Sequence, residues 1–460
     1  MSTKQSSGRS PIIESRDDLI AWIAAGERPA GDLLIGTEHE KFVFRKKGLA
    51  PVSYEGRDGI RALMEGLIER FGWEPIMEGR HIIALKRPDG QGTENVSLEP
   101  GGQFELSGAP LLTLHDVAAE TAKHLAEVKT IGDDLGLGFL GAGYSPNWTL
   151  AETPQMPKQR YGVMTRYMPQ VGKHGLDMMY RTCTIQVNLD FRSEPDMVKK
   201  FRVSLALQAL AMALFAASPF KEGKPNGFKT LRSEVWRDTD RNRTGILPFV
   251  FENGMCYDRY VEYALGVPMY FVYRNGNYID VAGASFRDFM AGKLPQLPGE
   301  LPTVDDWSDH LTTLFPEVRM KRFLEMRGAD SGSEQKITAL PAFWVGLLYD
   351  NNALDAAWDM VKGWSEDERQ DLRNEVPRYA LQGRFRRMKV LDLAREAMKI
   401  SEHGLTARRK VDAKGRDETM HLDCLREIVD SGRTTADDML QRFNTDWKGS
   451  TDPIFAEYAY

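Results

Sequence analysis

Five glutamates in three short segments are the side chains whose spacing best suits chemistry: Glu38, Glu40, Glu99, Glu105 and Glu325. Side chains at i and i+2 of a β-strand point to the same face, so the first two project together. Residues 100–102, Pro-Gly-Gly, predict a turn that folds the strand with Glu99 back towards the strand with Glu105. Carboxylates on one sheet face repel each other, and clustered oxygen ligands suit Mg²⁺ or Mn²⁺ shared with phosphates. The alternative is a solvated strand face with scattered acids.

A strand with one polar face is predicted from residue 181 to 191, where polar and apolar residues alternate. Cys183 falls on the apolar face, where a buried thiol is unreactive. Gln186 and Asn188 fall on the polar face. They either point into the carboxylate site or are solvated or bonded across the strand.

The remaining pattern predicts the elements that must position these residues. Strands are predicted over 33–44, 82–86, 93–107 (a hairpin), 136–144, 267–272 and 322–326, and helices over 15–25, 58–71, 114–135 and 203–217. Strands scattered among helices favour an α+β enzyme with a mainly antiparallel sheet over a doubly wound fold. Charged, helix-forming residues dominate from about Pro341. We therefore predict a polar tail (1–13), a catalytic domain (14–340) and a helical C-terminal subdomain (341–460).

Composition excludes several classes of function. The chain has 460 residues and a formal net charge of −6, which argues against a nucleic-acid partner. Three cysteines without paired spacing favour a reducing compartment, with no zinc site and no disulfide framework. The N-terminus has no apolar segment typical of a secretory signal. The most apolar stretch, 203–217, is too short to span a bilayer, so we expect no membrane association.

Two further segments have more than one reading. Residues 136–141 match the dinucleotide pattern GxGxxG, but the expected helix before and Pro146 after are the wrong context, so a closely packed glycine-rich strand is favoured. No P-loop motif occurs, so any nucleotide binds without one. Residues 231–245 carry four arginines in what we expect to be a loop. It either binds a substrate carboxylate or phosphate, or lies on the surface with balanced charges.

Eight segments, in order along the chain, resemble glutamate–cysteine ligases of the plant and α-proteobacterial type. They are GTEHEKF, SLEPGGQFELSG, RTCTIQVNLDF, RTGILPFVF, VPMYFVYR, FRDFMAGKLPQLPGELP, FLEMRGAD and LPAFWVGLLYD. The resemblance runs from about residue 14 to the C-terminus. It implies ATP-dependent joining of the γ-carboxylate of glutamate to the amine of cysteine through a γ-glutamyl phosphate, the first step of glutathione synthesis. It also implies a curved antiparallel sheet of the glutamine-synthetase type, flanked by helices.

The resemblance carries over a set of site residues. The implied ligands of Mg²⁺ or Mn²⁺ are Glu38, Glu40, Glu99, Glu105, Gln186 and Glu325. Arg327 would contact the transferred phosphate, with Glu38 as a second catalytic residue. The implied glutamate pocket consists of Arg160, Arg232, Trp236 and Tyr270. The implied small-molecule partners are the substrates glutamate, cysteine and ATP. The implied oligomeric state is a monomer or a homodimer.

Two departures from the plant members shape the expectation of location. Plant members carry cysteine pairs that form regulatory disulfides, whereas this chain has residues such as Val281, Gln296 and Thr338 at the matching positions. A plastid transit peptide is also missing. From these departures we expect a bacterial cytoplasmic enzyme. The alternatives left open are a ligase with another amine acceptor, a phosphotransferase and a non-catalytic binding protein.

Overall fold

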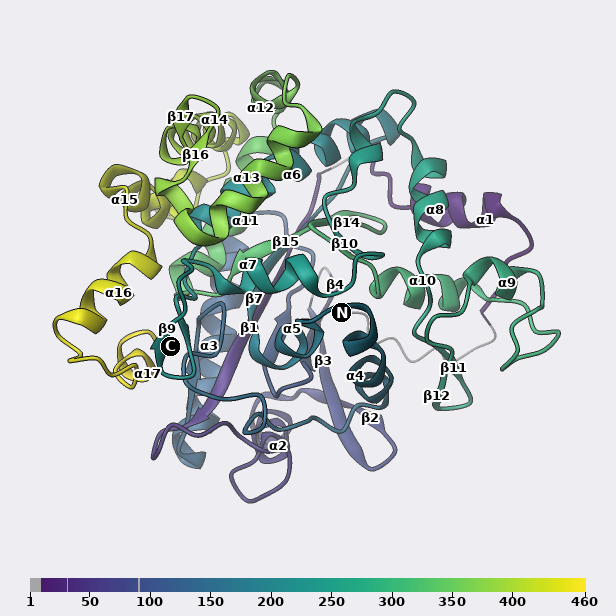
Figure 1. Ribbon diagram of the computed structural model, residues 1–460, viewed down its shortest axis with the longest axis horizontal. Coiled ribbons are helices and arrows are strands. Elements are labelled where there is room, and N and C mark those ends of the chain that lie inside the picture. The colour runs from purple at the N-terminus through teal and green to yellow at the C-terminus, as the bar shows by residue number, and fades with distance from the viewer. Residues whose placement is uncertain (1–9, 31, 90–91) are drawn as a thin grey trace.

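An antiparallel sheet of nine strands forms the centre of the protein (Figure 1). The computed structural model describes residues 10–30, 32–89 and 92–460. The strand order is β14-β15-β7-β1-β5-β4-β3-β2, and β6 pairs with β1 beside this path. The strands are β1 Ile35–Arg45, β2 Glu74–Glu78, β3 His81–Asp89, β4 Gly92–Leu98, β5 Phe104–Ser107, β6 Leu137–Leu140, β7 Thr184–Leu189, β14 Val318–Met320 and β15 Leu324–Asp330.

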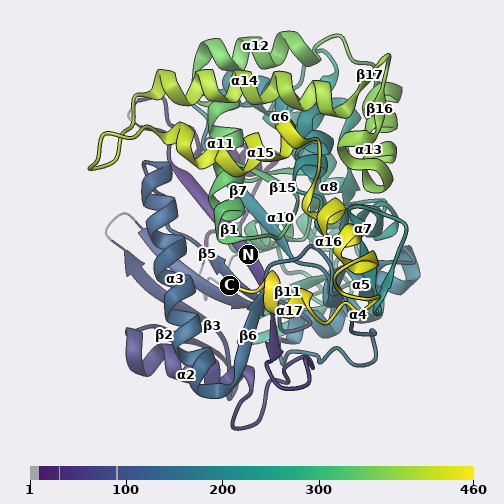
Figure 2. The same cartoon turned by 90° about the vertical axis from the view of Figure 1, so that its left-hand side faces the viewer.

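Helices cover the sheet on the side opposite the glutamates. The helix α3 (Leu114–Leu135) lies along this side in Figure 2, α11 (Glu334–Leu348) packs beside it, and α6 (Glu194–Leu214) packs against α11 and β15. The apolar face of β7 is buried in this layer, with Ile185, Val187 and Leu189 in the largest core cluster. The opposite face of the same strands therefore remains available for polar chemistry.

The other elements surround this core. The remaining helices are α1 Arg16–Ala24, α2 Ile60–Phe71, α4 Gln159–Val171, α5 Gly175–Arg181, α7 Leu231–Val235, α8 Tyr257–Gly266, α9 Phe286–Met290, α10 Val304–Thr312, α12 Asn351–Val361, α13 Glu366–Tyr379, α14 Val390–Arg408, α15 Asp423–Ser431, α16 Thr435–Asn444 and α17 Ile454–Glu457. Short strands pair as β8 Phe220–Lys221 with β9 Lys224–Pro225, β10 Thr244–Gly245 with β13 Phe315–Pro316, β11 Phe271–Arg274 with β12 Asn277–Asp280, and β16 Arg384–Phe385 with β17 Met388–Lys389. In the described part of the chain, no helix is long and apolar enough to cross a membrane.

Local signals in the sequence account for the elements that were predicted best. The helix α3 has the predicted bounds and begins at Thr113, whose hydroxyl accepts a hydrogen bond from the backbone N–H of Asp116. The predicted capping box opens α1, where the backbone N–H of Ser15 donates to Asp18 at 2.9 Å. The predicted hairpin forms from β4 and β5, and Gly102 adopts the left-handed conformation (φ 86°) in its turn.

Other predictions differ from the structure. The strand β2 was not predicted, and the strand expected over 267–272 is the short hairpin strand β11, outside the main sheet. The arginine-rich segment 231–245 is not a loop, since it contains α7, the 3₁₀ turn Trp236–Asp238 and β10. The predicted boundary between residues 340 and 341 falls inside α11. The change of composition there marks the start of more exposed helices, because α11 itself is buried against the sheet layer.

The C-terminal segment returns to the central sheet. Figure 2 shows α15, α16 and α17 descending from the helical layer towards β6. The backbone N–H of Tyr460 donates to the carbonyl of Phe139 at 3.0 Å, and the Tyr460 hydroxyl donates to the carbonyl of Gly332. Residues after 341 are therefore tied to the strands that carry the candidate site.

Candidate active site

Strand pairing brings the predicted metal ligands to one face of the sheet. Glu40 is paired with Glu105 of β5, and Glu38 is paired with Gln186 of β7. Glu325 of β15 is paired with Asn188. Directly opposed residues of antiparallel strands share a face, so these groups lie on neighbouring strands of the same surface.

Glu40, Glu99 and Glu105 form a cluster of excess negative charge. Burial and repulsion by Glu105 and Glu99 raise the pKa of Glu40 well above its ordinary value. Burial, and then repulsion by Glu105, raises the pKa of Glu99 to about 7. Neutral donors hydrogen-bond to each of its carboxylates: the Thr184 backbone N–H to Glu40 (3.0 Å), Ser97 to Glu105 (2.7 Å) and Tyr161 to Glu99 (3.3 Å). A cation would relieve this repulsion, so the cluster fits a divalent metal ion.

The glutamates do not yet form a coordination shell. In residues 10–30, 32–89 and 92–460, no three acidic, histidine or cysteine side chains converge on one point as a metal site. Gln186 adds to the fit, because its buried Oε1 atom has no hydrogen-bond partner in this part of the chain. An unpaired buried acceptor on the same face suits a positive ligand.

Glu325 lies in a different environment from the other glutamates. Its side chain is fully buried, and it forms ion pairs with Arg319 (2.7 Å), Lys321 (3.0 Å) and Arg327. Burial alone raises the pKa of a carboxyl group, yet these three cations hold the pKa of Glu325 well below its usual range. A metal ion at Glu325 would compete with three positive side chains. Its predicted role as a metal ligand is therefore not supported by this arrangement.

A pocket lies against this face and joins the acidic cluster to a positive wall. Glu40 and Glu99 line one part, and Arg232 and Arg327 line another. The side chains between them are mainly apolar or aromatic: Tyr161, Met164, Met178, Met179, Trp236 and Phe315. Such a pocket can bind an anion between a metal ion held by the glutamates on one side and the guanidinium groups of the arginines on the other.

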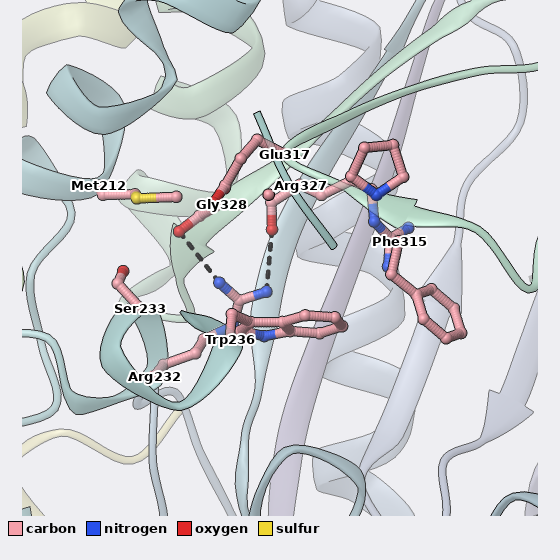
Figure 3. A pocket seen from close by; sticks show the side chains of 10 residues that line it. Met212, Arg232, Ser233, Trp236, Phe315, Glu317, Arg327 and Gly328 are labelled. Atoms are coloured by element: carbon pink, nitrogen blue, oxygen red, sulfur yellow. Dashed lines mark hydrogen bonds between the residues drawn. The ribbon is translucent and has the colours of Figure 1, made fainter. Parts of the chain in front are cut away.

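A bulge in β15 positions Arg232 and Arg327, which also line a smaller adjoining pocket, the one drawn in Figure 3. The pairing of β15 with β7 shifts register between Met326 and Ala329. Arg232 donates through Nη1 to the carbonyl of Gly328 (3.0 Å) and through Nη2 to that of Arg327 (2.9 Å), as Figure 3 shows. The centre of the Trp236 ring lies 5.7 Å from the guanidinium carbon of Arg232. Bulges of this kind re-aim side chains near active sites.

The other two predicted pocket residues are placed elsewhere. Tyr270 is buried, its hydroxyl donates to Asp240 (3.4 Å), and the guanidinium of Arg243 lies 3.8 Å from its ring centre. The structure therefore does not bring Tyr270 into the pocket lined by Glu40, Glu99, Arg232 and Arg327. Arg160 lies at the start of α4 and packs on Phe271, with 4.8 Å between guanidinium carbon and ring centre.

Sequence reasoning missed Arg319 and Lys321. Arg319 is paired across β14 and β15 with Glu325, and Lys321 lies two residues further on. Two basic residues at i and i+2, just before the segment FLEMRGAD, were the signal that could have found them. Arg319 and Lys321 both form ion pairs with Glu325. Arg327 is therefore not the sole counter-charge of Glu325, and its side chain also lines the pocket.

The surroundings of the three cysteines predict that turnover does not depend on redox conditions. Cys183 is fully buried, which raises the pKa of its thiol well above the ordinary value. Cys256 and Cys424 are half-buried, all three thiols are free, and burial raises the pKa of Cys424 to about 11. Dithiothreitol or a mild oxidant is expected to change turnover by less than about twofold, since protonated thiols react slowly. A large, reversible loss of turnover on reduction, with a mobility shift on a non-reducing gel, would contradict this.

Comparisons with known proteins agree with the resemblance. The profile of the family described as "Glutamate-cysteine ligase family 2(GCS2)" matches residues 34–457. The chain is 54% identical over 446 residues to the chloroplastic glutamate–cysteine ligase B of Oryza sativa subsp. japonica, covering 97% of this chain and 87% of that protein. The chloroplastic enzyme of Arabidopsis thaliana is 53% identical over the same length, with 97% and 83% covered.

A solved structure supports the fold. The glutamate–cysteine ligase of Francisella tularensis in complex with AMP superposes with a TM-score of 0.51 at 12% identity, covering 94% of this chain and 90% of that one. The predicted α+β class with a mainly antiparallel sheet is thereby confirmed.

The relatives also bear on the cellular location that the sequence analysis predicted for this protein. The prediction of a bacterial cytoplasmic enzyme is wrong against these comparisons, because the plant relatives are named as chloroplastic. That prediction depended on three positions and on the N-terminal segment, whereas the similarity extends over 97% of the chain.

With its profile match from residue 34 to 457 and with relatives above 50% identity, the chain belongs to glutamate–cysteine ligase family 2.

Proposed function

We propose that this protein joins the γ-carboxylate of glutamate to the amine of cysteine at the expense of ATP, giving γ-glutamylcysteine, ADP and phosphate. The observation that carries the proposal is the pocket with glutamates on one part of its wall and Arg232 and Arg327 on another. The choice of substrates follows from relatives that are named glutamate–cysteine ligases and are more than 50% identical over 97% of the chain.

The chemistry explains why both signs of charge are needed. A carboxylate does not condense with an amine at neutral pH, because its oxygen is a poor leaving group. Transfer of the γ-phosphoryl group of ATP makes an acyl phosphate, and the amine then displaces phosphate. Glutamate and ATP are both anions, so each must be bound beside the other against their repulsion.

The acidic cluster would hold Mg²⁺ or Mn²⁺. Glu40, Glu99 and Glu105 would be the principal ligands, with Glu38 and Gln186 on adjoining positions of β1 and β7. A bound divalent ion supplies charge neutralisation for the phosphate oxygens of ATP. Ser97, Tyr161 and the Thr184 backbone N–H hydrogen-bond to the carboxylates and orient them.

The positive wall would bind the reacting carboxylate and the migrating phosphoryl group. The backbone N–H of Arg327 donates to the carbonyl of Glu317 (3.2 Å), and its side chain pairs with Glu325. These contacts fix the guanidinium before substrate arrives, so its charge is available without reorganisation. Arg232 holds the backbone of the same bulge, while Trp236 and Phe315 contribute aromatic surface to the pocket wall.

The reaction can be tested directly on the purified protein. Incubation with ATP, Mg²⁺, glutamate and cysteine is expected to give γ-glutamylcysteine with one ADP and one phosphate per dipeptide. Mass spectrometry would identify the product, and omission of cysteine would serve as the control. Formation of AMP and pyrophosphate would contradict the acyl-phosphate route, and product only with another amine would contradict cysteine as acceptor.

A further inference from the structure

Asp330, the last residue of β15, carries a buried carboxylate that the proposed reaction does not use. The residue is fully buried, and within residues 10–30, 32–89 and 92–460 it forms no ion pair. Its Oδ2 atom accepts from the Ala217 backbone N–H (2.9 Å) and the Ser218 hydroxyl (2.7 Å), and its Oδ1 atom accepts from the Thr230 hydroxyl (2.8 Å). A buried charge is costly unless it is hydrogen-bonded, so these donors hold the carboxylate in one orientation.

The two hydroxyl groups connect Asp330 to the first turn of α7. The Ser218 hydroxyl accepts a hydrogen bond from the backbone N–H of Arg232 (3.3 Å). The Thr230 hydroxyl caps the helix by accepting one from the backbone N–H of Ser233 (3.3 Å). Each hydroxyl donates to the carboxylate and accepts from the helix backbone. Asp330 therefore determines where α7 begins, and with it the position of Arg232.

The contacts between β15 and α7 run in both directions. The guanidinium of Arg232 donates to the carbonyls of Arg327 and Gly328, and Asp330 follows two residues later on the same strand. Burial lowers the pKa of Arg232, and the negative charge of Asp330 is the largest influence that opposes this shift. Asp330 therefore stabilises the charge of Arg232 and, through the two hydroxyls, the backbone that carries it.

Gly143 leaves room for the carboxylate of Asp330. A Cβ atom at Gly143 would lie 2.2 Å from the Cγ atom of Asp330, closer than any side chain tolerates. Gly143 belongs to the glycine-rich segment 136–144, for which the sequence predicted a closely packed strand. The close approach at this glycine leaves the carboxylate little freedom to move.

We infer that Asp330 is a positioning residue that fixes the guanidinium of Arg232 in the positive wall of the pocket, acting through the hydroxyls of Ser218 and Thr230. The inference rests on the proposed function, since Arg232 is expected to bind the substrate glutamate. A purely structural role predicts only that breaking a bridge lowers stability. The positioning role predicts that the KM for glutamate changes as well.

Substitutions of Thr230 test the inference, because replacing Asp330 itself would leave three buried donors unsatisfied and is expected to destabilise the fold. Thr230→Val removes the hydroxyl and keeps the branched shape, and it is expected to raise the KM for glutamate at least about fivefold. Thr230→Ser keeps the hydroxyl and should stay within about twofold of wild type. An unchanged KM in Thr230→Val, or an equal rise in Thr230→Ser, would overturn the inference.

Thr113→Val controls for the loss of a helix cap. It makes the same substitution at the N-cap of α3, on the side of the sheet opposite the pocket. The melting temperature should fall while the KM for glutamate stays within about twofold of wild type. A rise in KM equal to that of Thr230→Val would mean that cap loss alone explains the effect, and would overturn the inference.

Crystal structures of the two Thr230 variants test the positioning without turnover. Thr230→Ser should keep both hydrogen bonds from the Arg232 guanidinium to the carbonyls of Arg327 and Gly328. Thr230→Val should lose at least one of them, and retention of both would refute the role of Asp330. This comparison stands even if wild type makes no dipeptide, so failure of the proposed function and failure of the inference are separable.

Discussion

Replacing Glu99 by glutamine is expected to lower turnover by at least about 10²-fold while raising the melting temperature of the metal-free protein near pH 8. The loss of turnover follows from removing one charged ligand of the acidic cluster. The gain in stability follows from the raised pKa of Glu99, about 7 in the folded protein against the ordinary 4.5. The folded state holds this proton more tightly than the unfolded state. The free energy of unfolding of the wild type therefore falls as pH rises through this window, and the variant lacks that loss.

Thermal melts in a chelator near pH 5 and near pH 8, followed by titration with Mn²⁺, would measure both effects. Wild type should regain stability with the metal ion at the higher pH, and Glu99→Gln should gain less. Glu40→Gln is expected to have the same two effects, since burial and repulsion by Glu105 and Glu99 raise the pKa of Glu40. Glu74→Gln, on the exposed edge strand β2, is the matched control and should change neither property. A variant at Glu99 that melts earlier and keeps its response to Mn²⁺ would show that Glu99 is a structural residue.

The acidic face could be predicted because its signals are local. The two-residue period places Glu38 and Glu40 on one side of β1, and the glycine turn at 101–102 closes the hairpin that carries Glu99 and Glu105. Neither inference needs a contact distant in sequence. The alternation in β7 predicted that Gln186 lies on the polar face of its strand but left open whether this face meets the glutamates, and the pairing of Gln186 with Glu38 places it beside them.

Two residues, Glu325 and Tyr270, lie in surroundings that their segments alone do not predict, because those surroundings depend on tertiary contacts. Glu325 has the residue type of a metal ligand, but the pairing of β14 with β15 surrounds it with cations from outside its own segment. Tyr270 matches a motif, yet the orientation of its side chain is set by the buried pair Asp240 and Arg243. A motif fixes the identity of a residue, whereas its direction depends on which elements pack around it.

Arg327 offers the sharpest test of the positive wall, because its loss should leave the fold intact. Removing it leaves Glu325 paired with Arg319 and Lys321, so no buried charge becomes isolated. Arg327→Ala is expected to lower kcat by at least about 10²-fold, since the charge acts on the phosphoryl group in the transition state. The KM for glutamate should change little, and circular dichroism should show an unchanged fold.

The contrast with Arg232 separates stabilisation of the transition state from substrate binding. Arg232→Ala is expected mainly to raise the KM for glutamate, as for a contact made equally in the ground state. Arg322→Ala, at an exposed arginine beside the same strand, is the control and should alter neither constant by more than about twofold. If Arg327→Ala raises the KM for glutamate and leaves kcat unchanged, Arg327 binds substrate and does not stabilise the migrating phosphoryl group. Arg232 also holds the carbonyl of Arg327, so a fall in kcat for both variants would mean that the β15 bulge positions the two arginines as one unit.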